Sequence, residues 1–232
     1  MSEVCIITGV GPGTGSALVR RFAAEGYQVA MIARDEQRLI NLQSTIERTR
    51  SYPCDVSDAN ALTSTLDQIL VEMGPPRILI HNAVAAARGD YLSVDTKAMN
   101  IAWQVNVMAL LTLSRWVTPH MIEREGGVIL CTGNTAAYRG KAHFAGFAPT
   151  KAAQRILMES IARHAGPQGI HAAFLAIDAV IDLEWTRKAF PDRPDDFFCH
   201  PDDIATACFD LAHQPKSAWA SEMVIRPFGE TW

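Results

Sequence analysis

A glycine-rich turn between an apolar strand and a helix constrains the fold of this chain more than any other feature. Residues 4–17 read VCIITGVGPGTGSA, a T-G-x-x-x-G-x-G pattern and not a strict G-x-G-x-x-G. Its glycines remove side chains where the backbone turns, and the following helix directs its positive N-terminal end at the turn. A turn that is tight only for packing is the alternative. Its place at the first strand–helix junction favours a dinucleotide-phosphate site formed by Gly9, Gly11, Pro12, Gly13, Thr14 and Gly15.

Short β-branched runs alternate with longer helical stretches along the whole sequence, which indicates βαβ units and a parallel sheet. We expect strands at 3–8, 27–33, 50–54, 77–81, 127–132, 170–177 and 222–226. We expect helices at about 14–25, 35–48, 58–73, 97–124, 143–166 and 201–213. The pattern predicts one α/β domain over residues 1–232, a doubly wound, parallel, seven-stranded Rossmann fold with helices on both faces.

The composition is that of an ordinary globular protein of 232 residues, with 48% hydrophobic and 20% charged residues and a net charge of −4. This slightly acidic balance argues against nucleic acid or a membrane surface as a partner, because both favour a basic face. Five scattered cysteines without a CxxC pair argue against a metal site or disulfides. With no evident signal peptide, we expect a reduced, cytoplasmic environment.

The tip of the second predicted strand, Ala33-Arg34-Asp35, should select the cofactor. A carboxylate here binds the ribose 2′-hydroxyl of NAD, whereas an arginine suits the 2′-phosphate of NADP. Arg34 therefore favours NADP, and NAD is the less expected cofactor. Asp35 would reverse this preference if it turned inward, but we expect it to cap the next helix. Arg34 as a solvated charge at a helix start is the alternative.

Several short motifs, in this order, resemble the short-chain dehydrogenase/reductase family over essentially the whole chain. They are TGVGPGTG at 8–15, Cys54-Asp55-Val56, His81-Asn82-Ala83, Asn106 and Lys151. The segments FAGFAPTKAA and SAWASEMVIRPFGETW resemble a divergent subgroup that typically lacks the active-site tyrosine.

The resemblance implies a role for each matching residue. Asp55 and Val56 would meet the adenine, while Asn82 and Ala83 would line the adenosine side of the site. Asn106 would hold a helix bulge and a water near Lys151, and Lys151 would bind the hydroxyls of the nicotinamide ribose. The positions after the sixth strand that would contact the nicotinamide are Asp178, Ala179 and Ile181.

The chain also departs from the family at its reaction centre. The tyrosine that normally lies four residues before the lysine and donates the proton is Phe147. The partner serine falls on Gly133 or Asn134, and the Asn-Asn-Ala-Gly motif ends in Val84. The usual Pro-Gly after the sixth strand is Asp178-Ala179. An ordinary alcohol dehydrogenase mechanism is therefore not expected.

Two residues are candidates to replace the missing donor. Tyr138 lies just past the fifth strand, where the dienoyl-CoA reductase branch of the family uses an upstream tyrosine. With Asn106 it would stabilise an enolate oxygen during hydride addition to an enoyl thioester. A loop aromatic that only packs is the alternative for Tyr138. Asn134 is the other candidate oxyanion donor.

Aromatic residues between the sixth strand and the last helix suggest an apolar substrate pocket. Trp185, Phe190, Phe197 and Phe198 fall in or beside a substrate-lid segment at about 183–203, and residues 190–203 are expected to be an irregular loop. Capping of the core is the alternative role for these rings. The aromatic tail of the segment 219–232 suggests contact with a neighbouring subunit, as in a homodimer or homotetramer.

Three functions agree with these features. The first is an NADP-dependent oxidoreductase with an altered proton donor, acting on an apolar carbonyl or enoyl small-molecule substrate. The second is a catalytically inactive NADP(H)-binding regulator. The third is a structural subunit of a hetero-oligomer, although a scaffold has no use for a ribose-binding Lys151.

Overall fold

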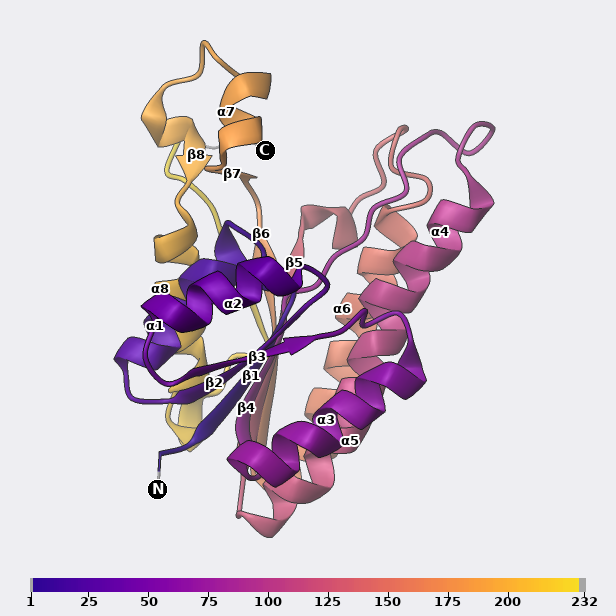
Figure 1. Cartoon of the computed structure of the whole chain (residues 1–232). Helices are drawn as coiled ribbons and strands as arrows, with labels where there is room; N and C mark the ends of the chain where they lie inside the picture. Colours follow the sequence, from indigo (N-terminus) through magenta and orange to yellow (C-terminus); the bar gives the residue numbers. More distant parts are fainter. Residues whose placement is uncertain (1, 230–232) are drawn as a thin grey trace.

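The computed structural model describes residues 2–229 and is shown in Figure 1. The end of the predicted aromatic tail, including Trp232, lies outside the described residues. The main strands are β1 (Val4–Thr8), β2 (Gln28–Ala33), β3 (Thr49–Pro53), β4 (Pro76–His81), β5 (Gly127–Asn134), β6 (Ile170–Ile177) and β9 (Glu222–Ile225). The main helices are α1 (Thr14–Ala24), α2 (Glu36–Thr45), α3 (Ala59–Met73), α4 (Thr96–Trp103), α5 (Ala109–Glu123), α6 (Ala148–Ala165) and α8 (Pro201–Ala212).

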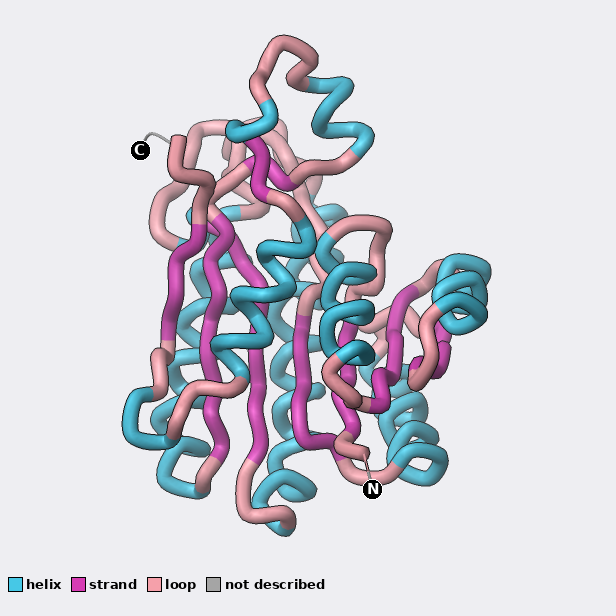
Figure 2. The backbone as a smooth tube through the Cα atoms, turned by 90° about the vertical axis from the view of Figure 1, so that its left-hand side faces the viewer, coloured by secondary structure: helices cyan, strands magenta, loops and turns pink. Residues whose placement is uncertain are grey.

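The seven main strands form one parallel sheet in the order β3-β2-β1-β4-β5-β6-β9 (Figure 2). The predicted doubly wound fold is confirmed. The chain reverses its direction of travel across the sheet between β1 and β4, and open α/β sheets bind ligands at the carboxyl ends of the strands at such a point.

Helices cover both faces of the sheet, and each face has its own apolar core (Figure 1). One core packs α3, α5 and α6 against residues such as Ile6, Leu79 and Phe174. The other packs α1, α2 and α8 against residues such as Ile7, Ile80 and Leu175. Alternate residues of each central strand therefore point to opposite cores, which explains why these strands are apolar throughout.

Two predicted helices differ from those observed. The helix expected over 97–124 is interrupted by a π-helical turn, η1 (Gln104–Met108), between α4 and α5. The helix expected over 143–166 begins only at Ala148, since Phe144 forms a bridge with Gly89 and Ala145 donates to the Gly89 carbonyl. This pairing holds residues 143–145 in a turn, and Pro149 then suits the first turn of α6.

The segment expected to be an irregular loop also contains regular structure. The lid segment and its approach form β7 (Val180–Ile181), α7 (Glu184–Ala189), a 3₁₀ turn η4 (Asp195–Phe197) and β8 (Phe198–Cys199). Strands β7 and β8 pair in parallel as a separate two-stranded sheet. Figure 1 shows this unit above the carboxyl edge of the main sheet, at the opposite end of the molecule from the N-terminus.

A substitution at Gly9 tests how tightly the turn after β1 packs against the residues that follow β4. Gly9 has a φ of +73°, and a Cβ there would lie 2.4 Å from the Ala83 nitrogen and 2.7 Å from the Asn82 carbonyl carbon. We expect Gly9→Ala to lower the free energy of unfolding by about 3 kcal/mol or more, because rigid backbone cannot make room. Urea titration would measure this loss.

Gly26 is the matched control, because its φ is +92° but a Cβ there would have nothing within 4 Å. Gly26→Ala should lower the free energy of unfolding by only about 1–2 kcal/mol, which is the cost of a Cβ in the left-handed backbone region. Equal losses for the two variants would contradict the packing argument.

Candidate functional site

Asn82 joins three strand ends at the point where the sheet reverses. Its side-chain amide donates to the Gly9 carbonyl at 2.9 Å, and its backbone N–H donates to the Thr8 carbonyl at 3.2 Å. The Thr132 hydroxyl of β5 donates to the Asn82 Oδ1 at 2.8 Å. Asn82 and the buried Ala83 therefore fix the turn after β1 against the ends of β4 and β5.

The N-terminus of α1 is arranged to receive an anion. Its N-cap residue is Gly13, no side chain caps the helix, and the first turn contains no acidic residue. The Thr14 hydroxyl is buried and has no hydrogen-bond partner among residues 2–229. Gly11 accepts from the Ser16 hydroxyl at 2.6 Å, which shapes the loop beside the exposed Pro12. Uncapped N–H groups and a spare hydroxyl fit the phosphates of a dinucleotide.

Arg34 and Asp35 lie at the tip of β2, and the structure separates their roles. Asp35 caps α2, as predicted: its Oδ1 accepts from the Arg38 N–H at 3.0 Å, and its Oδ2 pairs with the Arg38 guanidinium at 2.8 Å. The Asp35 carboxylate is thus engaged by α2, while the Arg34 side chain is exposed. A cation stands where the adenosine ribose is expected.

Asp55 and Val56 follow β3 at the same edge of the sheet. Burial pushes the pKa of Asp55 upward, but hydrogen bonds from Ser57 and the positive charge of Arg34 outweigh it and lower this pKa. Val56 is buried in the core that contains α3, α5 and α6.

The Lys151 ammonium is buried, with 2% of the residue exposed. It donates to the Gln154 Oε1 at 2.7 Å and lies 5.9 Å from the centre of the Phe147 ring. Burial lowers the pKa of Lys151 to about 8. Near neutral pH this group is a cation held away from water, close to the position of the missing tyrosine.

Asn106 lies in the π-helical turn and ties it to two other elements. Its Oδ1 accepts from the Ala85 N–H at 3.1 Å, and its Nδ2 donates to the Ala85 carbonyl and the Thr150 hydroxyl, each at 2.9 Å. The Asn106 carbonyl accepts from the Gln154 amide at 2.8 Å. The structure thus shows a helix bulge at Asn106 and a glutamine amide between this residue and Lys151.

His81 is a fully buried neighbour of Lys151 at the end of β4. Its Nε2 lies 3.0 Å from the Val105 carbonyl, which can only accept, so Nε2 carries the proton and Nδ1 accepts from the Thr8 hydroxyl at 2.9 Å. Burial, aided by the charge of Lys151, lowers the pKa of His81 to about 3. His81 is therefore a neutral structural bridge between β1, β4 and η1.

The structure places Tyr138 away from the Lys151 network. Its hydroxyl donates to the Glu222 carboxylate of β9 at 2.7 Å, and the Arg155 guanidinium lies 5.0 Å from its ring centre. Burial and Glu222 raise the pKa of Tyr138 to about 12. In this arrangement its proton is shared with Glu222.

Asn134 ends β5 at the carboxyl edge and caps the short turn η2 (Thr135–Ala137), where its Oδ1 accepts from the Ala136 N–H at 3.0 Å. Because Oδ1 is used in this cap, the Nδ2 group is the donor that the side chain can offer a ligand.

Asp178 follows β6 and is 6% exposed. Its Oδ1 accepts from the Thr135 hydroxyl at 2.6 Å and pairs with Arg139 at 3.3 Å, while Oδ2 is buried without a hydrogen-bond partner in the described part of the chain. Ala179 and Ile181 pack against the core that contains α1 and α8. The three residues thus lead from the sheet into the lid segment.

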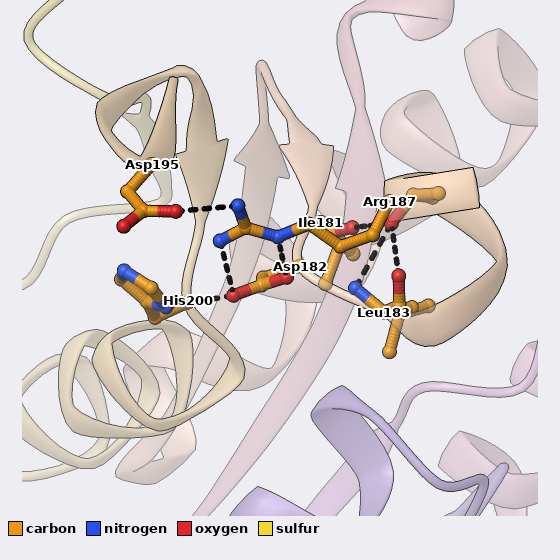
Figure 3. Close-up of polar contacts among 7 residues, drawn as sticks. Ile181, Asp182, Leu183, Arg187, Asp195 and His200 are labelled. Carbon is orange, nitrogen blue, oxygen red and sulfur yellow. Dashed lines mark hydrogen bonds and ion pairs between the residues drawn. The ribbon is translucent and has the colours of Figure 1, made fainter. Parts of the chain in front are cut away.

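The lid segment is held by a charged network (Figure 3). Arg187 pairs with both Asp182 oxygens, at 2.6 and 2.9 Å, and with Asp195 at 2.6 Å. His200 lies 3.2 Å from Asp182. The Arg187 guanidinium also stacks 4.0 Å from the centre of the buried Phe198 ring. These contacts make α7, β7 and β8 one unit.

Leu183 connects this unit to the glycine-rich turn. A Cβ on Gly13 would lie 2.4 Å from the Leu183 Cδ2, so the leucine packs directly on the Gly13 backbone. The lid segment therefore contacts the predicted phosphate site.

Two of the predicted lid aromatics are partly exposed. Trp185 and Phe190 are 59% and 40% exposed, and Phe197 packs against Phe190 and Phe198. A cavity of about 380 Å³ lies beside the start of α6, lined by Ala136, Ala137, Tyr138, Arg139, Gly140, Lys141, Ala142, Phe144, Ala145, Ala148, Pro149 and Ala152.

No cluster of potential metal ligands occurs within residues 2–229, and the five cysteines are free. None of the described helices is long and apolar enough to cross a membrane.

Sequence reasoning missed Gln154, Thr150 and Leu183. Gln154 left a signal, because it is a polar residue at a buried position on the same helix face as Lys151 and Met158. Thr150 and Leu183 left none, since their partners are remote in sequence.

The profile of the short chain dehydrogenases matches residues 3–188 of this chain. The chain belongs to the short-chain dehydrogenase/reductase family. A short chain dehydrogenase of Pseudocercospora fijiensis is 33% identical over 175 residues, which span 72% of this chain and 56% of that relative.

Solved structures of this oxidoreductase family resemble the chain over nearly its full length. A metagenomic short-chain oxidoreductase in complex with NADP is 25% identical, with a TM-score of 0.85 and 98% of each chain covered. An NADPH-bound short chain oxidoreductase of Pseudomonas aeruginosa, described as containing an atypical catalytic center, is 21% identical with a TM-score of 0.88, covering 98% of this chain and 96% of that one. This second likeness shows the fold alone.

The buried His81 predicts a loss of stability in acid. Unfolded histidine takes up a proton below about pH 6.5, but folded His81 does so only near pH 3, so acid favours the unfolded chain between these values. The free energy of unfolding should fall by about 2–3 kcal/mol between pH 6.5 and 4.5 from this residue. Urea titrations at several pH values would measure the slope.

His81→Asn should be less stable at pH 7 but should show a shallower loss toward acid. The exposed His164→Asn is the matched control and should keep the slope of the natural protein. A His81→Asn variant with an unchanged slope would contradict this origin of acid sensitivity.

Proposed function

We propose that this chain is an NADP(H)-dependent oxidoreductase that reduces or oxidises an apolar carbonyl or enoyl small molecule without a tyrosine proton donor. It would belong to a divergent subgroup in which phenylalanine replaces that tyrosine. The observation that carries the proposal is the uncapped N-terminus of α1 together with the buried ammonium of Lys151 on α6.

The residues present fit a dinucleotide. The α1 N–H groups and the Thr14 hydroxyl would hold the phosphates, Asp55 the adenine end, and Lys151 the hydroxyls of the nicotinamide ribose. The exposed Arg34 would pair with a 2′-phosphate, because Asp35 is occupied by Arg38. The NADP bound by the metagenomic relative agrees with this choice.

The cofactor would supply a hydride, and the chain must then stabilise the negative oxygen that results. Phe147 has no proton to give. We assign this role to the Asn134 Nδ2, which projects from the tip of β5, since a fixed amide donor stabilises an oxyanion without giving up a proton. Enoyl substrates suit such a site, because the amide would stabilise the enolate oxygen while solvent water delivers the proton to the α-carbon.

Tyr138 is the alternative donor. It would first have to leave Glu222, and its raised pKa disfavours proton transfer near neutral pH. The cavity beside α6 is lined by six alanines and Phe144 together with Tyr138, Arg139 and Lys141, and its apolar part supports an apolar substrate.

A catalytically silent NADP(H)-binding protein is the second candidate. The hydrocarbon ring of Phe147 and the engagement of the Tyr138 hydroxyl by Glu222 favour it. It predicts tight NADPH binding with no turnover of any acceptor.

We further propose a cytoplasmic homodimer or homotetramer. Ile101, Met108 and Ile122, along the α4–α5 stretch, are between 37% and 56% exposed and would be covered by a second copy. A structural subunit paired with an active relative would instead bind cofactor poorly.

Arg34→Ala should weaken NADPH binding by roughly 10- to 100-fold and leave NADH binding unchanged, because it removes one charged contact to the 2′-phosphate. Quenching of tryptophan fluorescence would measure both affinities. Arg50→Ala is the matched control, since Arg50 lies on the neighbouring strand β3 and pairs with Glu72 of α3. Equal losses for NADPH and NADH in Arg34→Ala would rule out the assigned contact.

Oxidation of NADPH in the presence of enoyl thioesters and apolar aldehydes or ketones tests the reaction. Asn134→Ala should lower kcat by about 100-fold, the effect of removing one oxyanion donor. If Tyr138→Phe lost activity while Asn134→Ala kept nearly the natural rate, Tyr138 and not Asn134 would be the group that stabilises the oxyanion. Binding without turnover of any substrate would favour the silent protein.

A further inference from the structure

We propose that Gln154 is a positioning residue that fixes the Lys151 ammonium and aims its remaining N–H groups at the ribose hydroxyls of the cofactor. This inference deepens the proposed function and rests on it for the identity of the ligand. The contacts of Gln154 with the chain stand independently of that ligand.

The Lys151 ammonium is surrounded by uncharged groups. The titratable groups that influence it from the packed strands are His81 on β4, which is neutral, and Cys131 on β5, whose pKa burial raises to about 12. No ion pair with a carboxylate is found for Lys151 among the described residues. The Gln154 Oε1 at 2.7 Å is the hydrogen-bond acceptor found for this ammonium in the described part of the chain.

The orientation of the Gln154 amide is determined by both of its neighbours. An ammonium can only donate, so it selects Oε1, while the Asn106 carbonyl can only accept, so it selects Nε2. If the amide were flipped, its NH₂ group would face the Lys151 ammonium, which also donates, and its oxygen would face the Asn106 carbonyl, which also accepts. Both ends of the amide are buried, so water cannot replace either bond.

The π-helical turn provides the fixed point of this arrangement. Asn106 is itself held by Ala85 and Thr150 through its side chain, so its carbonyl offers Gln154 a stationary acceptor. The hydrogen bonds from Lys151 to Gln154 and from Gln154 to Asn106 thus fix the ammonium relative to η1. One of the three N–H groups of Lys151 is used, and two remain for a diol.

The charge of Lys151 should also depend on Gln154. Removing the amide oxygen from a buried ammonium favours the neutral amine, whereas a carboxylate in its place favours the cation. A residue that served only to pack α6 would affect neither the titration of Lys151 nor its pH-dependent role.

The experiment follows Lys151 by NMR of the protein labelled at lysine Cε. The sequence has five lysines, at 97, 141, 151, 188 and 216, so Lys151→Arg identifies the signal. In the natural protein the midpoint should lie at about 8. Gln154→Leu should lower it by at least about one pH unit, and Gln154→Glu should raise it by about one to three.

Met158→Leu is the matched control, one turn further along the same buried face of α6, and should keep the natural midpoint. The same midpoint in Gln154→Glu as in the natural protein would overturn the proposal. Gln154→Glu keeps the side-chain oxygen and nearly the volume of glutamine. It therefore tests the proposal even if Gln154→Leu does not fold.

A second readout is the affinity for NADP⁺ between about pH 6 and 9. Affinity in Gln154→Leu should already lie below the natural value near pH 6, because the ammonium is no longer held in place. The deficit should widen by about tenfold near pH 8, where Lys151 of the variant has lost its proton. A deficit that is the same at every pH would indicate a packing role and overturn the proposal. If the natural protein binds no NADP⁺, the proposed function fails. The NMR midpoints would still show whether Gln154 controls the titration of Lys151.

Discussion

The close approach of Gly9 to the backbone of Asn82 and Ala83 is the constraint on which the carboxyl edge of the sheet depends. The two segments meet just beyond the carboxyl ends of β1 and β4, with no space for a side chain between them. Asn82 then ties this junction to β5 through Thr132. The directions of α1, of the loop after β4 and of the end of β5 all follow from this contact.

A second constraint is the burial of Lys151. Removing an ammonium from water is costly, and the chain offsets this with an amide and a distant aromatic ring in place of a counter-ion. Such an arrangement stabilises the folded chain little. It holds a cation with unused donors at a fixed place, and in the proposed function these donors would bind the neutral diol of a ribose. Phe147 would then remove the proton donor and leave this binding element in place.

The sequence predicted the sheet and its order of elements, because glycine spacing, apolar runs and the Asp35 cap are local signals. The start of α6 was misplaced because Phe144 and Ala145 pair with Gly89, more than fifty residues earlier. Strands β7 and β8 were missed because Arg187, Asp182 and Asp195 stabilise them, and no propensity reports such a network. The candidate site residues were predicted from family motifs, whereas Gln154, outside those motifs, became visible only from its contacts.

The packing of Leu183 on Gly13 has a consequence for the proposed function. Arg187 holds the parts of the lid segment together, and Leu183 lies on the glycine-rich turn. If the lid segment opened as one unit to admit a substrate, it would also remove this leucine from the proposed phosphate site. Substrate entry and dinucleotide release would then be coupled through the contact between Leu183 and Gly13, and a smaller side chain at position 183 would weaken that coupling.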